Sequence, residues 1–239
     1  MSQNAADSPS ITLEETIPLG RNAGEYNLMF NLSGIRDTAT YIDCGAGPSS
    51  FNAEMSVAER TVVSVDPLYD FTASDLSARA KTTLEGIMQQ VNTNREKYRW
   101  DIFRSVDQLK QSRSETMQRF LADYDDGKKQ GRYITASLPQ LPFEDKQFDI
   151  ALCSHLLFLY SEIFSLDFHL QAIREMMRVA GEVRIFPLVD LNGQPSVHLR
   201  DVIKTFRNEQ HHTQIINVPY EFQKGVNQCL LIRKKRPIL

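Results

Sequence analysis

Apolar residues along the chain fall into short continuous runs separated by segments with helical spacing. The runs ATYIDC (residues 39–44) and TVVSVD (61–66) are rich in β-branched and other apolar residues and predict buried parallel strands. Between them, Pro48 suits the first turn of a helix, where its missing N–H is not needed, and this helix is expected to reach about Glu59. Two strands and a helix within about 30 residues make a βαβ unit, which implies a parallel sheet.

Five further apolar runs predict the other strands of this sheet. They are RYITAS (132–137), FDIALCS (148–154), EVRIFPL (182–188), TQIINVPY (213–220) and QCLLIRKK (228–235). Helices are expected at about 24–32, 167–179 and 197–207 from the spacing of their apolar residues. Only residues 221–227 join the last two runs, which is too short for a crossover helix, so these two strands are expected to be antiparallel neighbours.

Residues 72–130 interrupt this alternation with a helical segment that is too long for an ordinary crossover. The residues that share one helical face are Leu76, Ala80, Leu84, Ile87 and Val91, and those that share another are Met117, Phe120, Leu121 and Tyr124. Ser112 and Glu115 have the spacing of a capping box, which predicts that the second helix begins there. Two interpretations stay open: a lengthened helical layer on one face of the sheet, or a cap over the substrate.

Composition and charge place the chain among globular proteins. Its 239 residues are 41% hydrophobic and 24% charged, which fits one large α/β domain. The net charge of -3 favours neither nucleic acid nor an anionic membrane as a partner, and the basic run at 233–236 is expected to be a solvated tail. The first ten residues lack a signal-peptide pattern, and no apolar run reaches about 18 residues. We therefore expect a cytoplasmic protein without a membrane anchor.

The three cysteines predict no disulfide and no metal site. Cys44, Cys153 and Cys229 are widely spaced, odd in number and without a CxxC pair. Each lies in or beside an apolar run, so we expect small buried residues in a reducing compartment.

The candidate binding and catalytic residues fall at the ends of the predicted strands, where ligands bind in open parallel sheets. In YIDCGAGPSSF, the glycines at 45 and 47 allow a tight turn and close approach to a ligand. Asp66, about twenty residues later, suits the two hydroxyls of a ribose. A pyrophosphate beside Asp43 would be repelled by about 1 kcal/mol or more. Asp43 suits a ligand with an ammonium group, as in the methionine part of S-adenosylmethionine.

These segments resemble the motifs of class I S-adenosylmethionine-dependent methyltransferases. The matching stretches are DCGAG (43–47), VVSVD (62–66), LPFEDKQFDIALCSHLL (141–157) and IREMMRV (173–179), and the resemblance covers roughly residues 38–235. It implies a Rossmann-like α/β fold: a seven-stranded, mostly parallel, doubly wound sheet in the order 3-2-1-4-5-7-6, with an antiparallel last strand and a helical insertion between strands 2 and 3. An uncharacterised bacterial group within this family has ends similar to two stretches of this chain, GRNAGEYNLMF and VPYEFQKG. This narrower resemblance does not indicate a substrate.

The resemblance also implies a domain division and residue roles. Residues 39–239 would form the methyltransferase domain, with 1–38 as a tail and short helix covering the site. S-adenosylmethionine would be the cofactor and S-adenosylhomocysteine the product. The implied cofactor contacts are Asp43 with the methionine ammonium, Gly45 and Gly47 with the methionine part, Asp66 with the ribose, Pro67, Leu68, Ser137 and Leu138 with the adenine, and Ser154 with the loop facing the methyl group. Ser49 stands where the family motif has a third glycine, and Ser137 where an acid is common.

Acceptor contacts are less determined by the sequence. His155 follows the fourth strand and is the candidate general base, with a packed or helix-capping histidine as the alternative. Tyr26, Tyr160 and Tyr220 are candidate substrate contacts, although aromatic residues are more often core. Arg21 is a candidate for the methionine carboxylate or an acidic substrate, with a solvated arginine as the favoured alternative.

The predicted function is methyl transfer to a small molecule by in-line displacement, in a monomer or homodimer that binds neither nucleic acid nor membrane. Alignment of the reactants contributes much of such catalysis, so the lack of a catalytic triad is no objection. Two alternatives remain: a nicotinamide-dependent oxidoreductase, which Asp66 suits and Asp43 disfavours, and a non-catalytic protein that binds S-adenosylmethionine or S-adenosylhomocysteine.

Overall fold

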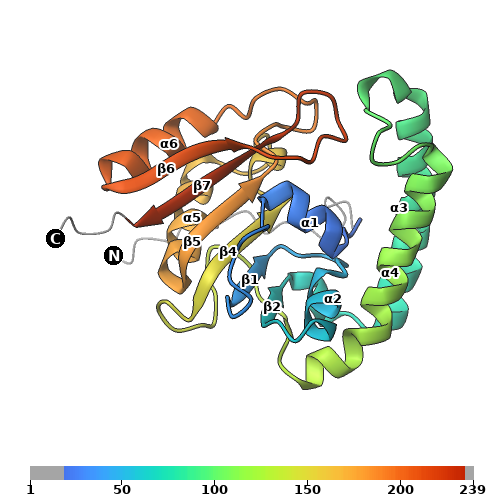
Figure 1. Cartoon of the computed structure of the whole chain (residues 1–239), viewed down its shortest axis with the longest axis horizontal. Coiled ribbons are helices and arrows are strands. Elements are labelled where there is room, and N and C mark those ends of the chain that lie inside the picture. Colours follow the sequence, from blue (N-terminus) through green and yellow to red (C-terminus); the bar gives the residue numbers. More distant parts are fainter. Residues whose placement is uncertain (1–18, 235–239) are drawn as a thin grey trace, which may run out of the picture.

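Seven strands form one sheet at the centre of the computed structural model, which describes residues 19–234 (Figure 1). The strands are β1 (Tyr41–Cys44), β2 (Val62–Val65), β3 (Tyr133–Ile134), β4 (Phe148–Ser154), β5 (Ala180–Phe186), β6 (His211–Asn217) and β7 (Gln228–Lys234). Their order is β3-β2-β1-β4-β5-β7-β6. Strands β1 to β5 pair in parallel, and β7 runs antiparallel to both β5 and β6. The predicted sheet, its order and its antiparallel last strand are confirmed.

Helices cover both faces of this sheet. They are α1 (Ala23–Phe30), α2 (Phe51–Val57), α3 (Ala73–Thr93), α4 (Val106–Lys129), α5 (Leu166–Val179) and α6 (Leu199–Asn208), with short 3-10 helices at Pro67–Asp70, Arg95–Lys97 and Phe158–Tyr160. Helices α1, α2 and α4 pack together on one side, whereas α5 and α6 pack on the other (Figure 1). None of the helices within residues 19–234 is long and apolar enough to cross a bilayer.

Three predicted boundaries are wrong. Helix α4 begins at Val106 because Ser105 caps it, accepting a hydrogen bond from the Gln108 N–H at 3.1 Å; Ser112 lies inside the helix. Helix α2 begins at Phe51, so Pro48 belongs to the preceding turn. Strand β3 has two residues instead of six, because the chain turns away where Ser137 bridges to Gln140.

The insertion between β2 and β3 is a helical hairpin whose tip is fastened to another part of the chain. Tyr98, in the α3–α4 connection, forms a β-bridge with Gln223 in the β6–β7 connection. The Arg99 N–H donates to the Phe222 carbonyl at 2.7 Å, and Tyr98 stacks on the Phe222 ring at 4.8 Å. The hairpin therefore stands beside the sheet and reaches the connection of its last two strands (Figure 1).

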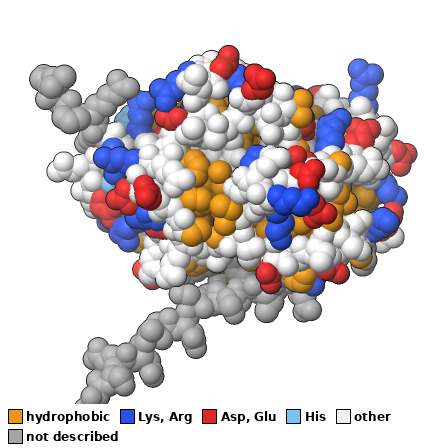
Figure 2. Space-filling model, turned by 90° about the horizontal axis from the view of Figure 1, so that it is seen from below, with side chains coloured by type: hydrophobic (Ala, Val, Ile, Leu, Met, Phe, Trp, Pro, Cys, Tyr) orange, Lys and Arg blue, Asp and Glu red, His pale blue; other side chains and the backbone are white. Residues whose placement is uncertain are grey.

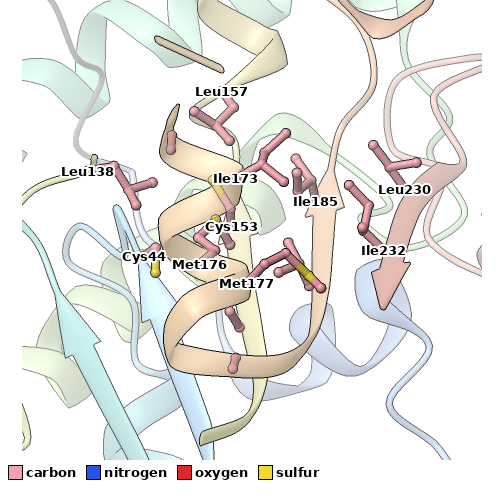
Figure 3. Close-up of a cluster of buried hydrophobic side chains, with 14 of the residues drawn as sticks. Cys44, Leu138, Cys153, Leu157, Ile173, Met176, Met177, Ile185, Leu230 and Ile232 are labelled. Atoms are coloured by element: carbon pink, nitrogen blue, oxygen red, sulfur yellow. The ribbon is translucent and has the colours of Figure 1, made fainter. Parts of the chain in front are cut away.

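The largest part of the core lies between α5 and the sheet. Figure 3 shows Ile173, Met176 and Met177 of α5 directed toward side chains of β4, β5 and β7. Burial of such side chains stabilises the fold by about 1.5–3 kcal/mol each. The cysteines Cys44, Cys153 and Cys229 are buried and unpaired, as predicted.

Candidate active site

A cavity opens where the parallel strands end at their carboxyl side. It encloses about 880 Å³ of empty space including its open mouth. The predicted cofactor residues that line it are Gly45, Gly47, Asp66, Pro67, Leu68, Ser137, Leu138 and Ser154. His155, Tyr26 and Tyr160 line it as well. Asp43 and Tyr220 are buried and lie behind this lining.

The turn after β1 needs both of its glycines. Gly45 and Gly47 have φ angles of 67° and 54°, in the left-handed region that favours glycine. A Cβ atom at Gly45 would lie 2.5 Å from Cδ2 of Leu156, whereas one at Gly47 would meet no atom within 4 Å. Gly45 therefore makes room for the chain after β4, and Gly47 faces open space where a ligand can approach the backbone.

Asp66 is held rigidly at the end of β2. Its Oδ1 accepts from the Leu68 N–H and its Oδ2 from the Gly47 N–H, each at 2.8 Å. Burial raises the pKa of Asp66 to about 6, although these two N–H groups act in the opposite direction. Each carboxylate oxygen keeps further acceptor capacity. The side chain can thus accept hydrogen bonds from the hydroxyl groups of a molecule in the cavity.

Asp43 is completely buried within β1, and only one of its oxygens has a partner. The Tyr26 hydroxyl donates to Oδ2 at 2.8 Å, whereas Oδ1 has no hydrogen-bond partner among the described residues. Burial raises the pKa of Asp43 to about 8; the Tyr26 hydroxyl opposes this shift and the Asp66 charge adds to it. The carboxyl group is therefore mainly neutral at pH 7, and a cation beside it would favour its ionised form.

His155 directly follows β4 and is fixed by its backbone and by its ring. Its N–H donates to the Phe186 carbonyl at 2.7 Å, and its Nδ1 lies 2.8 Å from the Ser154 hydroxyl. Burial lowers the pKa of His155 well below its usual value, and the charges of Arg21 and Arg113 act in the same direction. The imidazole is neutral at pH 7, and its Nδ1 lies against the Ser154 hydroxyl.

Comparisons with known proteins agree with this geometry. A family model described as a methyltransferase domain matches residues 104–182. The strand order with an antiparallel β7, and the glycine turn after β1, belong to the same fold. The chain belongs to the class I S-adenosylmethionine-dependent methyltransferases. It also shares a family with an uncharacterized protein of Methanocaldococcus jannaschii, 33% identical over 225 residues that cover 94% of this chain and 99% of the relative.

Solved structures similar to this methyltransferase include magnesium protoporphyrin IX methyltransferase from Synechocystis with bound S-adenosylhomocysteine. The TM-score is 0.49 at 12% identity, over 89% of this chain and 81% of that chain. A TehB-like S-adenosylmethionine-dependent methyltransferase from Corynebacterium glutamicum has a TM-score of 0.46 at 15% identity, over 89% and 88% of the two chains.

The cavity of the methyltransferase fits the cofactor that its family uses. The unpartnered oxygen of Asp43 offers a buried acceptor for an ammonium group. Gly47 leaves open space beside the backbone, and Asp66 offers acceptors for two hydroxyl groups at the end of the neighbouring strand. The match to a methyltransferase domain favours this cofactor over a nicotinamide cofactor, so the oxidoreductase alternative is set aside.

Several residues of this region were missed or misjudged from the sequence. Arg21 is not a solvated arginine: it lines the cavity, and its Nε atom is buried. Glu25 and Arg113 form a buried ion pair through two hydrogen bonds of 2.6 and 2.7 Å. Tyr220 donates its hydroxyl to Glu25 at 3.0 Å and not toward the cavity. The ion pair could not be recognised from the sequence because Glu25 and Arg113 lie 88 residues apart in the chain.

Proposed function

We propose that this methyltransferase transfers a methyl group from S-adenosylmethionine to a small-molecule acceptor bound in the cavity. The observation that carries the proposal is the cavity itself, which combines the glycine turn, Asp66 and the neutral His155 at the carboxyl ends of adjacent strands. The N-terminal segment also lines it, through Leu19, Arg21 and Tyr26. A site covered in this way suits a small acceptor better than a polymer.

Neither the net charge nor the face shown in Figure 2 supports a nucleic-acid substrate. The net charge is -3, and the face in Figure 2 mixes acidic and basic side chains, with hydrophobic side chains gathered between them. Single-stranded nucleic acids are bound by positively charged grooves with exposed aromatic residues. We therefore infer that the methyl acceptor is a small molecule.

The cofactor roles follow the positions of the side chains. Asp66 would hold the ribose hydroxyls, and Asp43 would face the methionine ammonium with Tyr26 fixing its orientation. The methionine part would lie along Gly45 and Gly47. The adenine would lie among Pro67, Leu68, Ser137 and Leu138, and Ser154 would border the methyl group.

The residues around the acceptor would align it, exclude water and remove its proton. The cofactor supplies a methyl group on a positively charged sulfur, which is an excellent leaving group. His155 would take the proton of an acceptor hydroxyl or amine on Nε2, and Ser154 would hold the ring through Nδ1. Tyr160 would form part of the wall around the acceptor. Alignment of this kind can supply several kcal/mol of the barrier.

The compartment that fits this proposal is the cytoplasm. The three cysteines are buried and unpaired, as expected where thiols stay reduced.

A transfer assay with labelled S-adenosylmethionine tests the proposal. A cell extract is separated by ultrafiltration into molecules below and above about 3 kDa, and each fraction is incubated with the enzyme. We expect label in new products of the low-mass fraction. Label only in the high-mass fraction would assign a macromolecular acceptor, and label in neither would argue for a protein that binds the cofactor without transferring its methyl group.

A further inference from the structure

The segment between β4 and α5 forms one wall of the cavity and has little regular structure. Its residues His155, Leu156 and Tyr160 line the cavity, and its regular element is the short 3-10 helix Phe158–Tyr160. The Leu156 side chain lies against the glycine turn, because a Cβ atom at Gly45 would come within 2.5 Å of its Cδ2. The shape of this wall therefore depends on the contacts that hold the segment from outside the cavity.

The backbone at His155 shows that this segment is constrained. The φ angle of His155 is 52°, in the left-handed region that residues other than glycine rarely adopt. Such a conformation persists only where the surrounding contacts impose it. One of these contacts is the hydrogen bond from the His155 N–H to the Phe186 carbonyl. A second contact acts two residues later, on the carbonyl of Leu157.

That second contact comes from His169, a completely buried residue near the start of α5. Its Nε2 lies 2.9 Å from the Leu157 carbonyl oxygen, and its Nδ1 lies 2.8 Å from the Ser165 carbonyl oxygen. A carbonyl oxygen only accepts hydrogen bonds, and a neutral imidazole has one N–H to donate. Burial lowers the pKa of His169, so the ring is neutral at pH 7 and can donate to only one of the two carbonyl groups.

The other hydrogen bonds of the two carbonyl groups indicate which of them receives the ring proton. Ser165 already accepts the backbone N–H of His169 at 3.1 Å, as in any helix. Leu157 accepts the Tyr160 N–H at 3.3 Å, but that N–H is shared with the Leu156 carbonyl at 3.2 Å. Leu157 is completely buried, and a buried carbonyl group without a full hydrogen bond is costly. The proton therefore belongs on Nε2, where it completes the hydrogen bonding of Leu157.

The later part of the segment is held by other side chains. Nε2 of His198 lies 3.0 Å from the Phe164 carbonyl oxygen and 3.2 Å from that of Ser161, so one N–H serves both. The Ser161 hydroxyl donates to the Phe158 carbonyl. These contacts fix residues 158–164 and leave the Leu157 carbonyl to His169.

We propose that His169 is a positioning residue for methyl transfer, acting through the hydrogen bond from its Nε2–H to the Leu157 carbonyl. This bond keeps Leu156 against the glycine turn and His155 in the cavity wall. His169 acts from behind that wall, in which its neighbour Phe168 takes part. The inference goes beyond the proposed function, because holding the segment in place requires no particular acceptor.

The proton on the His169 ring can be located directly by NMR. Long-range proton–nitrogen correlation spectra of isotope-labelled protein at pH 7 distinguish the two ring nitrogens, and the signals that are lost in His169→Gln belong to this ring. We expect a protonated Nε2 and an unprotonated Nδ1. A ring protonated at Nδ1 alone would overturn the proposal, since the Leu157 carbonyl would then face a lone pair. The measurement needs neither acceptor nor cofactor, so its failure is distinct from a failure of the proposed function.

Two isosteric variants separate this role from simple packing. The amide nitrogen of His169→Gln can reach the place of Nε2, whereas that of His169→Asn reaches only the place of Nδ1. In His169→Asn we expect hydrogen exchange in residues 155–164 to become about tenfold faster, because a buried carbonyl group loses its donor. Turnover with the active low-mass fraction should fall by about the same factor, with little change in the dissociation constant of S-adenosylhomocysteine.

His169→Gln should recover most of the loss in both measurements. The control is His212→Gln, at a partly exposed histidine of β6, which should match wild type. Equal effects of the Asn and Gln variants at position 169 would show that this side chain only fills space, and the proposal would be wrong. Circular dichroism verifies folding, and the NMR measurement on wild type decides if His169→Asn does not fold.

Discussion

The hydroxyl of Tyr26 lies 2.8 Å from Oδ2 of Asp43 and joins helix α1 to the strand that leads into the glycine turn. The Tyr26 ring is stacked on Phe51 of α2 at 4.4 Å, so its position is fixed by packing as well as by the hydrogen bond. A segment outside the sheet thus orients the acid of the motif and leaves Oδ1 of Asp43 for a ligand. The N-terminal helix is part of the proposed cofactor site.

Binding of S-adenosylhomocysteine should release a proton. Asp43 is mainly neutral at pH 7 because its pKa is about 8, and the ammonium of the ligand would favour the ionised carboxylate. Calorimetric titrations at pH 7 in phosphate and in Tris, which differ in ionisation enthalpy, should give different observed enthalpies that correspond to release of up to one proton. Equal enthalpies in the two buffers would contradict this. Asp43→Asn should bind more weakly and release less.

Asp43 should also make the ligand-free protein less stable as the pH rises. Its pKa of about 8 in the folded protein exceeds the ordinary value of about 3.9 in an unfolded chain, so the folded state binds more protons between these values. Stability from this group is complete below about pH 4 and is lost as the pH rises to about 8. Asn cannot ionise, so the melting temperature of Asp43→Asn relative to wild type should increase from pH 5 to pH 8. A constant difference would show that Asp43 is ionised throughout.

Gly45→Ala should damage both folding and cofactor binding. The new methyl group meets Leu156 at 2.5 Å, and φ at this position is 67°, so we expect a loss of about 1–3 kcal/mol in the free energy of unfolding. The matched control is Gly86→Ala in the middle of α3, where a Cβ meets no atom within 4 Å. That change should stabilise the protein by about 0.5–1 kcal/mol. Urea unfolding of both variants measures their free energies of unfolding. Equal changes in the two variants would contradict the expected difference between the two sites.

Removal of the charge at Glu25 should destabilise the protein strongly. Glu25→Gln leaves Arg113 buried without its counter-ion, and breaking a buried pair in this way costs about 3–5 kcal/mol. Lys129→Ala, which removes an exposed ion pair with Asp126, should leave the melting temperature unchanged. A loss of less than about 1 kcal/mol for Glu25→Gln would mean that water reaches the pair, contrary to its burial.

The sequence predicted those features that depend on local patterns. Strands β1, β2 and β4 are apolar runs, and a candidate site residue or turn follows each of them directly. The glycine turn, Asp66 and His155 could therefore be placed together. Their order in the sheet came from the family resemblance. The start of α4 was missed because Ser112 and Glu115 imitate a helix start inside a long polar helix, in which the true cap is Ser105.

The group of charged side chains formed by Arg21, Glu25 and Arg113 could not be predicted in this way. It depends on the N-terminal segment, on α4 and on the β6–β7 connection, which meet only in the folded chain. The charge balance among Arg21, Glu25 and Arg113 is set by burial and by contacts between distant segments. No spacing of residues along the chain indicates how these three charges are balanced.

Calorimetric titration with S-adenosylhomocysteine tests the central claim most directly. Wild-type protein, shown to be folded and free of bound ligand, should bind one molecule with a micromolar dissociation constant, about -8 kcal/mol. Asp66→Ala should weaken binding at least tenfold, because the ribose hydroxyls lose their acceptor while the Asp43 site remains. Absence of binding to the wild type would contradict the claim, since the glycine turn and its two acids would then be a scaffold without a cofactor.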